Sequence, residues 1–235
     1  MEQIAKETRK KIFEIVCRNK AGHLASSLSS VEILTVLYFG GILNYRSQEP
    51  QWENRDRFVL SKGHSALGYY VTLARAGFFS LEEVDTFCVA GTKYGGLPLK
   101  DKVIGVEATT GSLGHGLSFA AGIAINAKIL KKKYLTYVLV GDGESQEGSI
   151  WEAALFIAQN KLINLVIIID YNKIQATGRC KDIIGLEPYR KKWEAFGFEV
   201  LEIDGHDIKS IRNALEIRSI ELSRPRVVIS HTVKG

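Results

Sequence analysis

Residues 135–172 read LTYVLVGDGESQEGSIWEAALFIAQNKLINLVIIIDYN. The run 135–140 is β-prone and stops at a Gly-Asp-Gly turn, residues 141–143, which predicts a buried strand that ends in a site. Residues 146–159 place apolar side chains at helical spacing. Residues 165–169 are apolar without alternation, as in a strand covered on both faces. A strand, a helix and a second strand in this order predict a parallel unit with a right-handed crossover.

Two polar residues follow the two strands of this unit. Asp142 comes directly after the first strand and Asn172 after the second. Because parallel strands end at the same edge of a sheet, we expect these side chains to emerge side by side. Carboxylate and amide oxygens suit Mg²⁺ or Ca²⁺, whose shells are commonly completed by phosphates and water. Asp and Asn also stabilise ordinary turns, so the spacing alone leaves a metal site and a simple turn both open.

The rest of the chain alternates helices and strands in the same way. Two Ser-x-x-Glu segments, Ser29–Glu32 and Ser80–Glu83, have capping-box spacing and predict helix starts. The pattern predicts an α/β fold: a doubly wound, mainly parallel sheet with helices on both faces, in one domain over residues 1–235. We expect strands near 58–60, 137–140, 165–169, 199–203 and 227–229, and helices near 4–18, 65–76, 114–132 and 207–218.

Composition narrows the class of protein. Hydrophobic residues make up 46% of the 235 residues, charged residues make up 24%, and the net charge is +5. No apolar run reaches membrane-spanning length, and no recognition motif suggests nucleic-acid binding. The three cysteines are too few and too scattered for a disulfide framework or a zinc site. We therefore expect a cytoplasmic protein that binds neither membranes nor nucleic acid.

Five ordered segments together resemble the transketolase family. Four of them are GHLASSLS at residues 22–29, RDRFVLSKGH at 55–64, TTGSLGHG at 109–116 and IDGHD at 203–207. The fifth is the GDG segment with its downstream Asn, which resembles the family's thiamine diphosphate motif. The resemblance covers nearly the whole chain and implies the thiamine diphosphate-binding fold.

The resemblance implies a cofactor site with a divalent cation, Mg²⁺ or Ca²⁺. By this resemblance Asp142 and Asn172 would bind the metal through their side chains, and Ile174 through its backbone carbonyl. Asn172, Gly143 and Glu144 would also contact thiamine diphosphate.

Histidines and a glycine-rich segment complete the implied site. His64 would donate to a diphosphate oxygen, and Gly111 and Leu113 would contact the aminopyrimidine ring. His23 lies in a segment that resembles the substrate channel, where an imidazole could move protons near neutral pH. We therefore expect His23 to be the catalytic residue of this chain.

A full transketolase has three joined domains, and this chain resembles the first of them. The glutamate that activates the aminopyrimidine lies in the second. The resemblance therefore implies the N-terminal subunit of a split transketolase, inactive alone, which transfers a two-carbon ketol unit from a ketose to an aldose. Its partner would be a C-terminal transketolase subunit with the pyrimidine-binding domain, the C-terminal domain and the catalytic glutamate. Self-association into an α2β2 assembly and binding of sugars or sugar phosphates are expected.

Three departures from the family pattern bear on the substrate. Leu97 stands where family members carry a histidine that binds donor hydroxyls, and His115 stands where many carry Gln. The sequence also stops at Gly235, before a loop that supplies a further histidine in longer members. There are two alternatives. One is a specialised ketol or acyl transferase for an unusual sugar, and the other is a degenerate cofactor-binding scaffold. A nucleotide-binding Rossmann protein is disfavoured because no G-x-G-x-x-G opens the first strand–helix unit.

Overall fold

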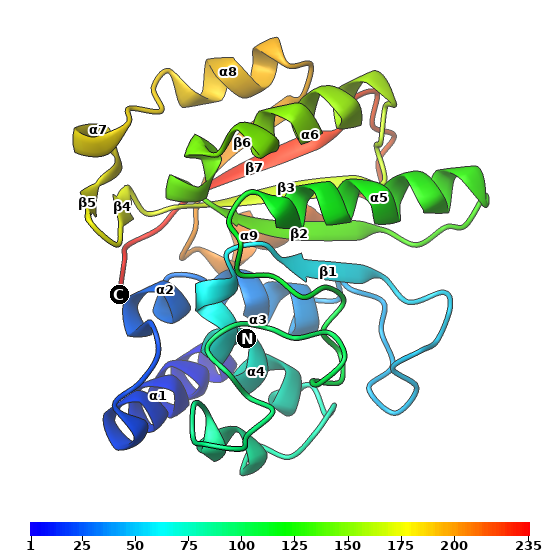
Figure 1. The fold of residues 1–235 in the computed structure, drawn as a ribbon. Helices are drawn as coiled ribbons and strands as arrows, with labels where there is room; N and C mark the ends of the chain where they lie inside the picture. The colour runs from blue at the N-terminus through cyan, green and yellow to red at the C-terminus, as the bar shows by residue number, and fades with distance from the viewer.

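The computed structural model describes residues 1–235 and is built on a five-stranded parallel sheet (Figure 1). The strand order is β1-β2-β3-β7-β6, and all four neighbouring pairs are parallel. All five expected strands are present, within one or two residues of the expected bounds. The strands are β1 (Arg57–Leu60), β2 (Thr136–Gly141), β3 (Leu165–Tyr171), β6 (Glu199–Asp204) and β7 (Arg226–His231).

Helices cover both faces of this sheet, as a doubly wound fold requires (Figure 1). On one face the sheet shares its core with α3 (Val31–Phe39), α4 (Ala66–Arg75) and α9 (Ile208–Leu215), and α1 (Glu2–Asn19) packs against α3 and α4. The other packs against α5 (His115–Ile129), α6 (Gly148–Gln159) and α8 (Tyr189–Ala195). The predicted fold class is therefore confirmed.

The central strands are apolar on both faces because each face has its own core. Ile167 and Ile168 are neighbours in β3, point to opposite sides and are both 0% exposed. Burying a side chain of this size contributes about 1.5–3 kcal/mol. The unbroken apolar run at residues 165–169 follows from this two-sided burial.

Short elements connect the main ones. They are α2 (Leu24–Leu28), α7 (Cys180–Ile183), three 3₁₀ turns η1 (Gly63–Ser65), η2 (Glu83–Thr86) and η3 (Gly143–Gln146), and a hairpin of β4 (Ile174–Gln175) with β5 (Gly178–Arg179). No helix has the combination of length and apolarity needed to cross a bilayer.

The two predicted capping boxes have different outcomes. Ser80 and Glu83 make both reciprocal bonds, at 3.2 and 3.4 Å, but they begin only the 3₁₀ turn η2. At Ser29–Glu32 the prediction of a capping box was wrong, although α3 does begin at Val31. The Glu32 carboxylate accepts bonds from Arg9 and contacts His206, so tertiary partners take the place of the local cap.

Sheet topology gathers the ends of β1, β2, β3 and β7 at one edge. The chain runs from β3 out to the edge strand β6 and returns to form β7 between them. Open α/β sheets bind ligands outside the carboxyl ends of their strands. Segments that follow these four strands therefore meet at one place, and the C-terminal segment lies there too, beside α2 (Figure 1).

Candidate functional site

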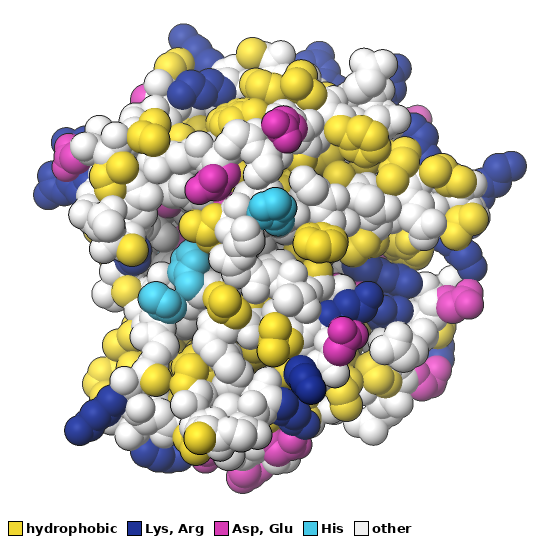
Figure 2. All heavy atoms as spheres, viewed as in Figure 1, with side chains coloured by type: hydrophobic (Ala, Val, Ile, Leu, Met, Phe, Trp, Pro, Cys, Tyr) yellow, Lys and Arg dark blue, Asp and Glu magenta, His cyan; other side chains and the backbone are white.

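A cavity of about 630 Å³ opens at the carboxyl ends of the strands, and all the residues predicted for the site line it. Figure 2 shows a hollow on this face with two histidine side chains beside each other at its rim. The predicted lining residues are His23, His64, Gly111, Leu113, Asp142, Gly143, Glu144, Asn172 and Ile174. Residues from the first and the last third of the chain therefore converge on one cavity.

Asp142 and Asn172 lie where the strand ends were expected to bring them. The Asp142 side chain is 2% exposed and accepts from the backbone N–H of Gly143 at 2.7 Å and from that of Lys173. Burial raises the pKa of Asp142, and the two backbone bonds oppose that rise. The Asn172 side-chain oxygen accepts from the N–H of Ile174 at 3.1 Å. These bonds fix both side chains at the rim of the cavity.

The donor set at this rim fits a hard divalent cation. One carboxylate, one amide oxygen and one backbone carbonyl offer oxygen ligands, and no cluster of three or more His, Cys, Asp or Glu is arranged to hold a metal. Such a sparse set suits an ion that takes its remaining ligands from phosphates and water. The carbonyl of Ile174 already accepts from the Lys234 ammonium at 2.7 Å, so a positive charge stands at this carbonyl.

Two glycines allow the backbone to line the cavity closely. A Cβ on Gly143 would lie 2.9 Å from the Gln175 side-chain oxygen. Gly111 has a φ of +143°, and a Cβ there would lie 2.5 Å from the Leu97 Cδ1 atom. Gly111 therefore favours glycine because its φ would strain any other residue, whereas at Gly143 a side chain would have to displace the flexible end of Gln175.

The Glu144 carboxylate is hydrogen-bonded to other groups of the protein. Its carboxylate is buried and accepts from Gly114 N at 2.9 Å, from Gly141 N at 3.0 Å and from the Ser61 hydroxyl. Burial raises the pKa of Glu144, and the bond from Ser61 opposes it most. Glu144 thus joins the ends of β1 and β2 to the start of α5. A direct contact of Glu144 with cofactor stays a prediction.

A buried ion pair beneath the cavity was not predicted from the sequence. Lys62 is 1% exposed, Asp170 is 0% exposed, and the two form a salt bridge. The Asp170 carboxylate also accepts from the hydroxyls of Ser29, at 2.7 Å, and Thr232. The sequence offered one signal for this pair, a charged residue at the end of each of two apolar strands. The pairing itself joins residues 108 positions apart and could not be deduced from spacing.

The two histidines of the cavity differ in burial. Their rings form an edge-to-face pair with centroids 5.8 Å apart. His64 is largely buried, and burial, aided by the nearby Lys62 and His23, lowers its pKa to about 3. His64 is therefore a neutral imidazole near pH 7. His23 is exposed at the rim, so it can reach a molecule in the cavity.

The whole chain, residues 1–235, matches the family model described as "Transketolase, thiamine diphosphate binding domain". This chain belongs to the transketolase family. It is 44% identical to an apulose-4-phosphate transketolase subunit of Phocaeicola vulgatus and 48% identical to the protein of that name from Actinobacillus succinogenes. Both alignments cover 100% of this chain, with 83% and 85% of the relatives. A third relative, 38% identical over 100% of this chain and 85% of its own length, is 6-deoxy-6-sulfo-D-fructose transketolase subunit SqwG of a Clostridium species.

Solved transketolase structures share the fold. The transketolase of Leishmania mexicana superimposes with a TM-score of 0.93 at 30% identity, over 98% of this chain and 36% of the solved chain. That of Campylobacter jejuni gives 0.89 at 33% identity, over 98% of this chain and 38% of the solved chain. This chain therefore spans about a third of these transketolases but most of the relatives that are themselves transketolase subunits.

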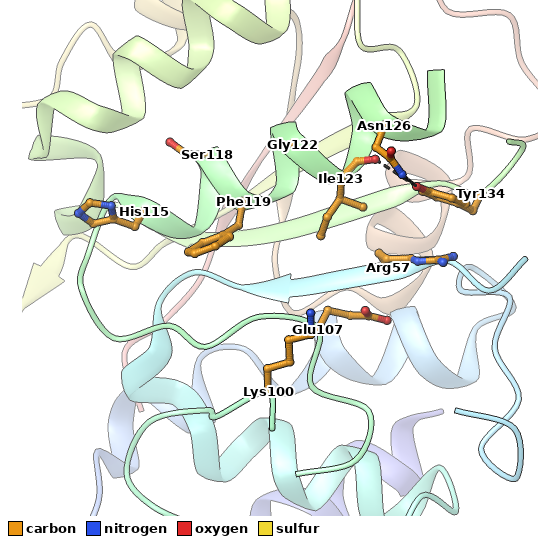
Figure 3. Close-up of a pocket in the computed structure, with 10 residues that line it drawn as sticks. All are labelled: Arg57, Lys100, Glu107, His115, Ser118, Phe119, Gly122, Ile123, Asn126 and Tyr134. Atoms are coloured by element: carbon orange, nitrogen blue, oxygen red, sulfur yellow. Dashed lines mark hydrogen bonds between the residues drawn. The ribbon is translucent and has the colours of Figure 1, made fainter. Parts of the chain in front are cut away.

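Leu97 and His115 are two of the three departures expected from the family resemblance, and they lie at different places. Leu97 lines the cavity at the strand ends and is 43% exposed there, and its carbonyl accepts from the Tyr70 hydroxyl at 2.9 Å. His115 lies outside that cavity, in a second hollow along α5 (Figure 3). Residue 97 thus lines the cavity at the strand ends, whereas residue 115 does not.

Proposed function

We propose that this chain is the cofactor-binding subunit of a split transketolase that transfers a two-carbon ketol unit from a ketose to an aldose. The observation that carries the proposal is the convergence of all the predicted site residues on one cavity, in a chain that matches separate transketolase subunits along its full length. Thiamine diphosphate would supply the electron sink for carbon–carbon bond cleavage. The chain itself would supply binding, orientation and hydrogen bonds.

Each group of residues has a proposed task. Asp142, Asn172 and the Ile174 carbonyl bind Mg²⁺ or Ca²⁺, and the cation neutralises the diphosphate charge. Gly143 brings the backbone N–H close to the diphosphate. His64, neutral near pH 7, donates one ring N–H to a diphosphate oxygen while its burial keeps it from taking up a second proton.

The other end of the cavity would hold the aminopyrimidine ring and the substrate. Gly111 and Leu113 contact the ring, and Glu144 fixes the segment that carries them through Gly114. His23 donates to, or accepts a proton from, a substrate oxygen at the rim. This chain is proposed to act in the cytoplasm, in an α2β2 assembly with a C-terminal subunit that brings the catalytic glutamate.

The lining of the cavity favours a specialised donor sugar. Leu97 presents an apolar side chain to the cavity, where a histidine would offer a hydrogen bond. Relatives named for apulose-4-phosphate and for 6-deoxy-6-sulfo-D-fructose are consistent with an unusual ketose. In the assembled enzyme, Leu97→His should raise kcat/KM for a linear pentulose phosphate about tenfold relative to the natural donor. An unchanged ratio would remove Leu97 from the determinants of specificity.

Calorimetric titration tests the cofactor site directly. Thiamine diphosphate with Mg²⁺ is titrated into the chain co-purified with its companion subunit, then again with EDTA and with Asp142→Ala. Saturable binding that is lost in both controls supports the site, and Asn172→Ala should lose nearly as much. A folded complex that binds no cofactor would instead identify a degenerate scaffold.

A further inference from the structure

The residues that follow β7, residues 232–235, lie beside the cofactor cavity. They run past the carboxyl ends of the strands toward α2 (Figure 1). Lys234 lines the cavity and donates to the Ile174 carbonyl at 2.7 Å. A Cβ on Gly235 would lie 2.5 Å from the Cα of Ala25, so the segment also touches α2. The position of this segment therefore decides where the Lys234 ammonium stands in the cavity.

The sheet holds only the first part of this segment. The N–H of Thr232 donates to the Tyr171 carbonyl at the end of β3, at 3.3 Å. Val233 lies two residues beyond the last register pair of β6 and β7, so the ladder offers its N–H no carbonyl. Instead the Val233 N–H donates to the Nε2 atom of His206 at 2.9 Å. An imidazole thus replaces the carbonyl of a neighbouring strand.

This bond fixes the protonation of the His206 ring. A backbone N–H can only donate, so Nε2 has to accept and carries no proton. The other nitrogen, Nδ1, lies 3.0 Å from the Glu32 carboxylate, an acceptor, and therefore carries the proton. Histidine in water favours the opposite tautomer, with the proton on Nε2. Glu32 thus selects the tautomer that leaves Nε2 able to accept from Val233.

Glu32 is itself held by Arg9. The Arg9 guanidinium donates to both carboxylate oxygens, at 2.6 Å to Oε1, and the Glu32 residue is 8% exposed. The same guanidinium donates to the carbonyl of Leu28, the last residue of α2, at 2.8 Å. The first residues of α2 line the cavity. Arg9, Glu32 and His206 therefore form one set of hydrogen bonds that joins α2 to residues 232–235 across one side of the cavity.

The loop that carries His206 is packed closely on the same segment. The N–H of Gly205 donates to the His231 carbonyl at 2.8 Å. A Cβ on Gly205 would lie 2.4 Å from the Thr232 Cγ2 atom and 3.0 Å from the His231 carbonyl oxygen, so a side chain there would collide. Asp204 accepts from the backbone N–H of His206 at 2.8 Å and fixes the loop. The contact is thus built from backbone, glycine and imidazole together.

We propose that His206 is a positioning residue of the cofactor site, which holds residues 232–235 at the cavity through its Nδ1-protonated tautomer. His206 does not line the cavity, so it acts through Val233 and Lys234. Without the bond to Val233, the segment moves more freely and the Lys234 ammonium is no longer fixed at the cavity. Because the cavity is proposed to bind a diphosphate, a displaced ammonium lowers cofactor affinity. This last effect rests on the proposed function, whereas the tautomer and the holding of the segment do not.

Two matched variants separate the roles of the two ring nitrogens. In His206→Gln the side-chain oxygen reaches the place of Nε2 and can accept from Val233. In His206→Asn the side-chain NH₂ takes the place of the Nδ1–H and can donate to Glu32, but no acceptor reaches Val233. Both variants lose the packing of the ring. His206→Gln should therefore restore whatever depends on the bond to Val233.

Nuclear magnetic resonance of the full chain tests the bond without cofactor. Long-range ¹H–¹⁵N correlation should show a proton on Nδ1 and none on Nε2 of His206, whose signals are identified by their loss in His206→Gln. The amide proton of Val233 should exchange with solvent about fivefold faster in His206→Asn than in wild type or His206→Gln. A proton on Nε2, or equal exchange in the two variants, would overturn the proposal.

Calorimetric titration of thiamine diphosphate with Mg²⁺ into the assembled complex tests the consequence. His206→Asn should weaken cofactor binding about fivefold, as for one lost hydrogen bond, while His206→Gln should stay within about twofold of wild type. His231→Asn is the control, because His231 also bonds a carboxylate, that of Glu202, and lies outside the cavity. It should change affinity less than about twofold. Equal losses in the two His206 variants would reduce His206 to a packing role.

The outcomes separate this inference from the proposed function. A wild-type complex that binds no thiamine diphosphate would overturn the proposed function, and the tautomer and amide exchange would still decide whether His206 holds the segment. Fast exchange of Val233 in His206→Asn with unchanged cofactor affinity would show that the segment does not position the cofactor, and would overturn the inference while the function stands.

Discussion

The two hollows of this molecule are nearly equal in size, about 630 and 680 Å³, but they differ in whether their charged side chains are buried and paired. In the cofactor cavity the buried charges are paired: Lys62 with Asp170, and Glu144 with three donors. In the second hollow, which lies along α5, Lys100 and Arg57 form no salt bridge, and the Phe119 ring is half-exposed. The two hollows are thus distinguished by the burial and pairing of their charged groups rather than by volume. Substitutions in the two hollows should therefore differ in their effects on folding.

The largest expected effect is on the ion pair beneath the cavity. Asp170→Ala leaves the Lys62 ammonium buried without its partner, and removing one member of a buried pair costs about 3–5 kcal/mol. The free energy of unfolding from denaturant titration measures this loss. The double variant Lys62→Met/Asp170→Leu should lose less than the sum of the single variants, because no charge is left unpaired. Additive losses would show that the two side chains act independently.

His23 should affect turnover rather than binding. In the assembled enzyme, His23→Ala should lower kcat about 100-fold, the low end of general acid–base effects, because this exposed imidazole lies at the rim of the cavity, where we propose that it contacts substrate. Cofactor affinity should remain unchanged. His231→Ala is a suitable control, since His231 bonds to Glu202 at 2.8 Å and does not line the cavity. Normal turnover in His23→Ala would refute the role of His23.

His64 should make folding sensitive to acid. Its pKa is about 3 in the folded chain, against an ordinary value of 6.5. The unfolded chain therefore binds the proton more tightly, and stability from this residue falls as the pH drops below 6.5. Between pH 7 and pH 5 the wild type should lose about 2 kcal/mol more than His64→Gln. Parallel pH profiles of the two proteins would show that the imidazole is accessible to protons when folded.

Phe119 should have the smallest effect on folding. Its ring is 54% exposed, so Phe119→Asp should change the free energy of unfolding of the isolated chain by only about 0.5 kcal/mol or less. Thermal and denaturant unfolding of the isolated chain measure this. A loss as large as that of Asp170→Ala would mean that the hollow along α5 belongs to the core, and the distinction between the two hollows would fail.

The sequence predicted those parts of the fold that depend on local patterns. Apolar runs at residues 137–140 and 165–169 identified buried strands, and the rule that parallel strands end at one edge brought Asp142 and Asn172 together. The family resemblance supplied the remaining residues of the cavity. The Gly-rich segment at Gly111 could be placed in the cavity only through that resemblance, because its φ and its contact with Leu97 depend on tertiary structure.

Features that depend on distant partners were not predictable. Glu32 was expected to cap a helix but binds Arg9 and lies against His206, 174 positions away. The Lys62–Asp170 pair likewise joins two separate strand ends. Local spacing carries no information on such pairings, because the sheet topology alone decides which strand ends become neighbours.

Glu144 has a consequence for exchanging parts between related subunits. One carboxylate joins Gly141, beside the proposed cation site, to Gly114, beside the proposed ring site, and also binds Ser61. A single carboxylate, which accepts hydrogen bonds from three segments, therefore links the two halves of the proposed cofactor site. A chimaera that takes only α5 and its preceding loop from another subunit would keep only part of this hydrogen-bonded link. It should position both halves of the cofactor correctly only if Ser61 and Glu144 came from the same subunit as α5.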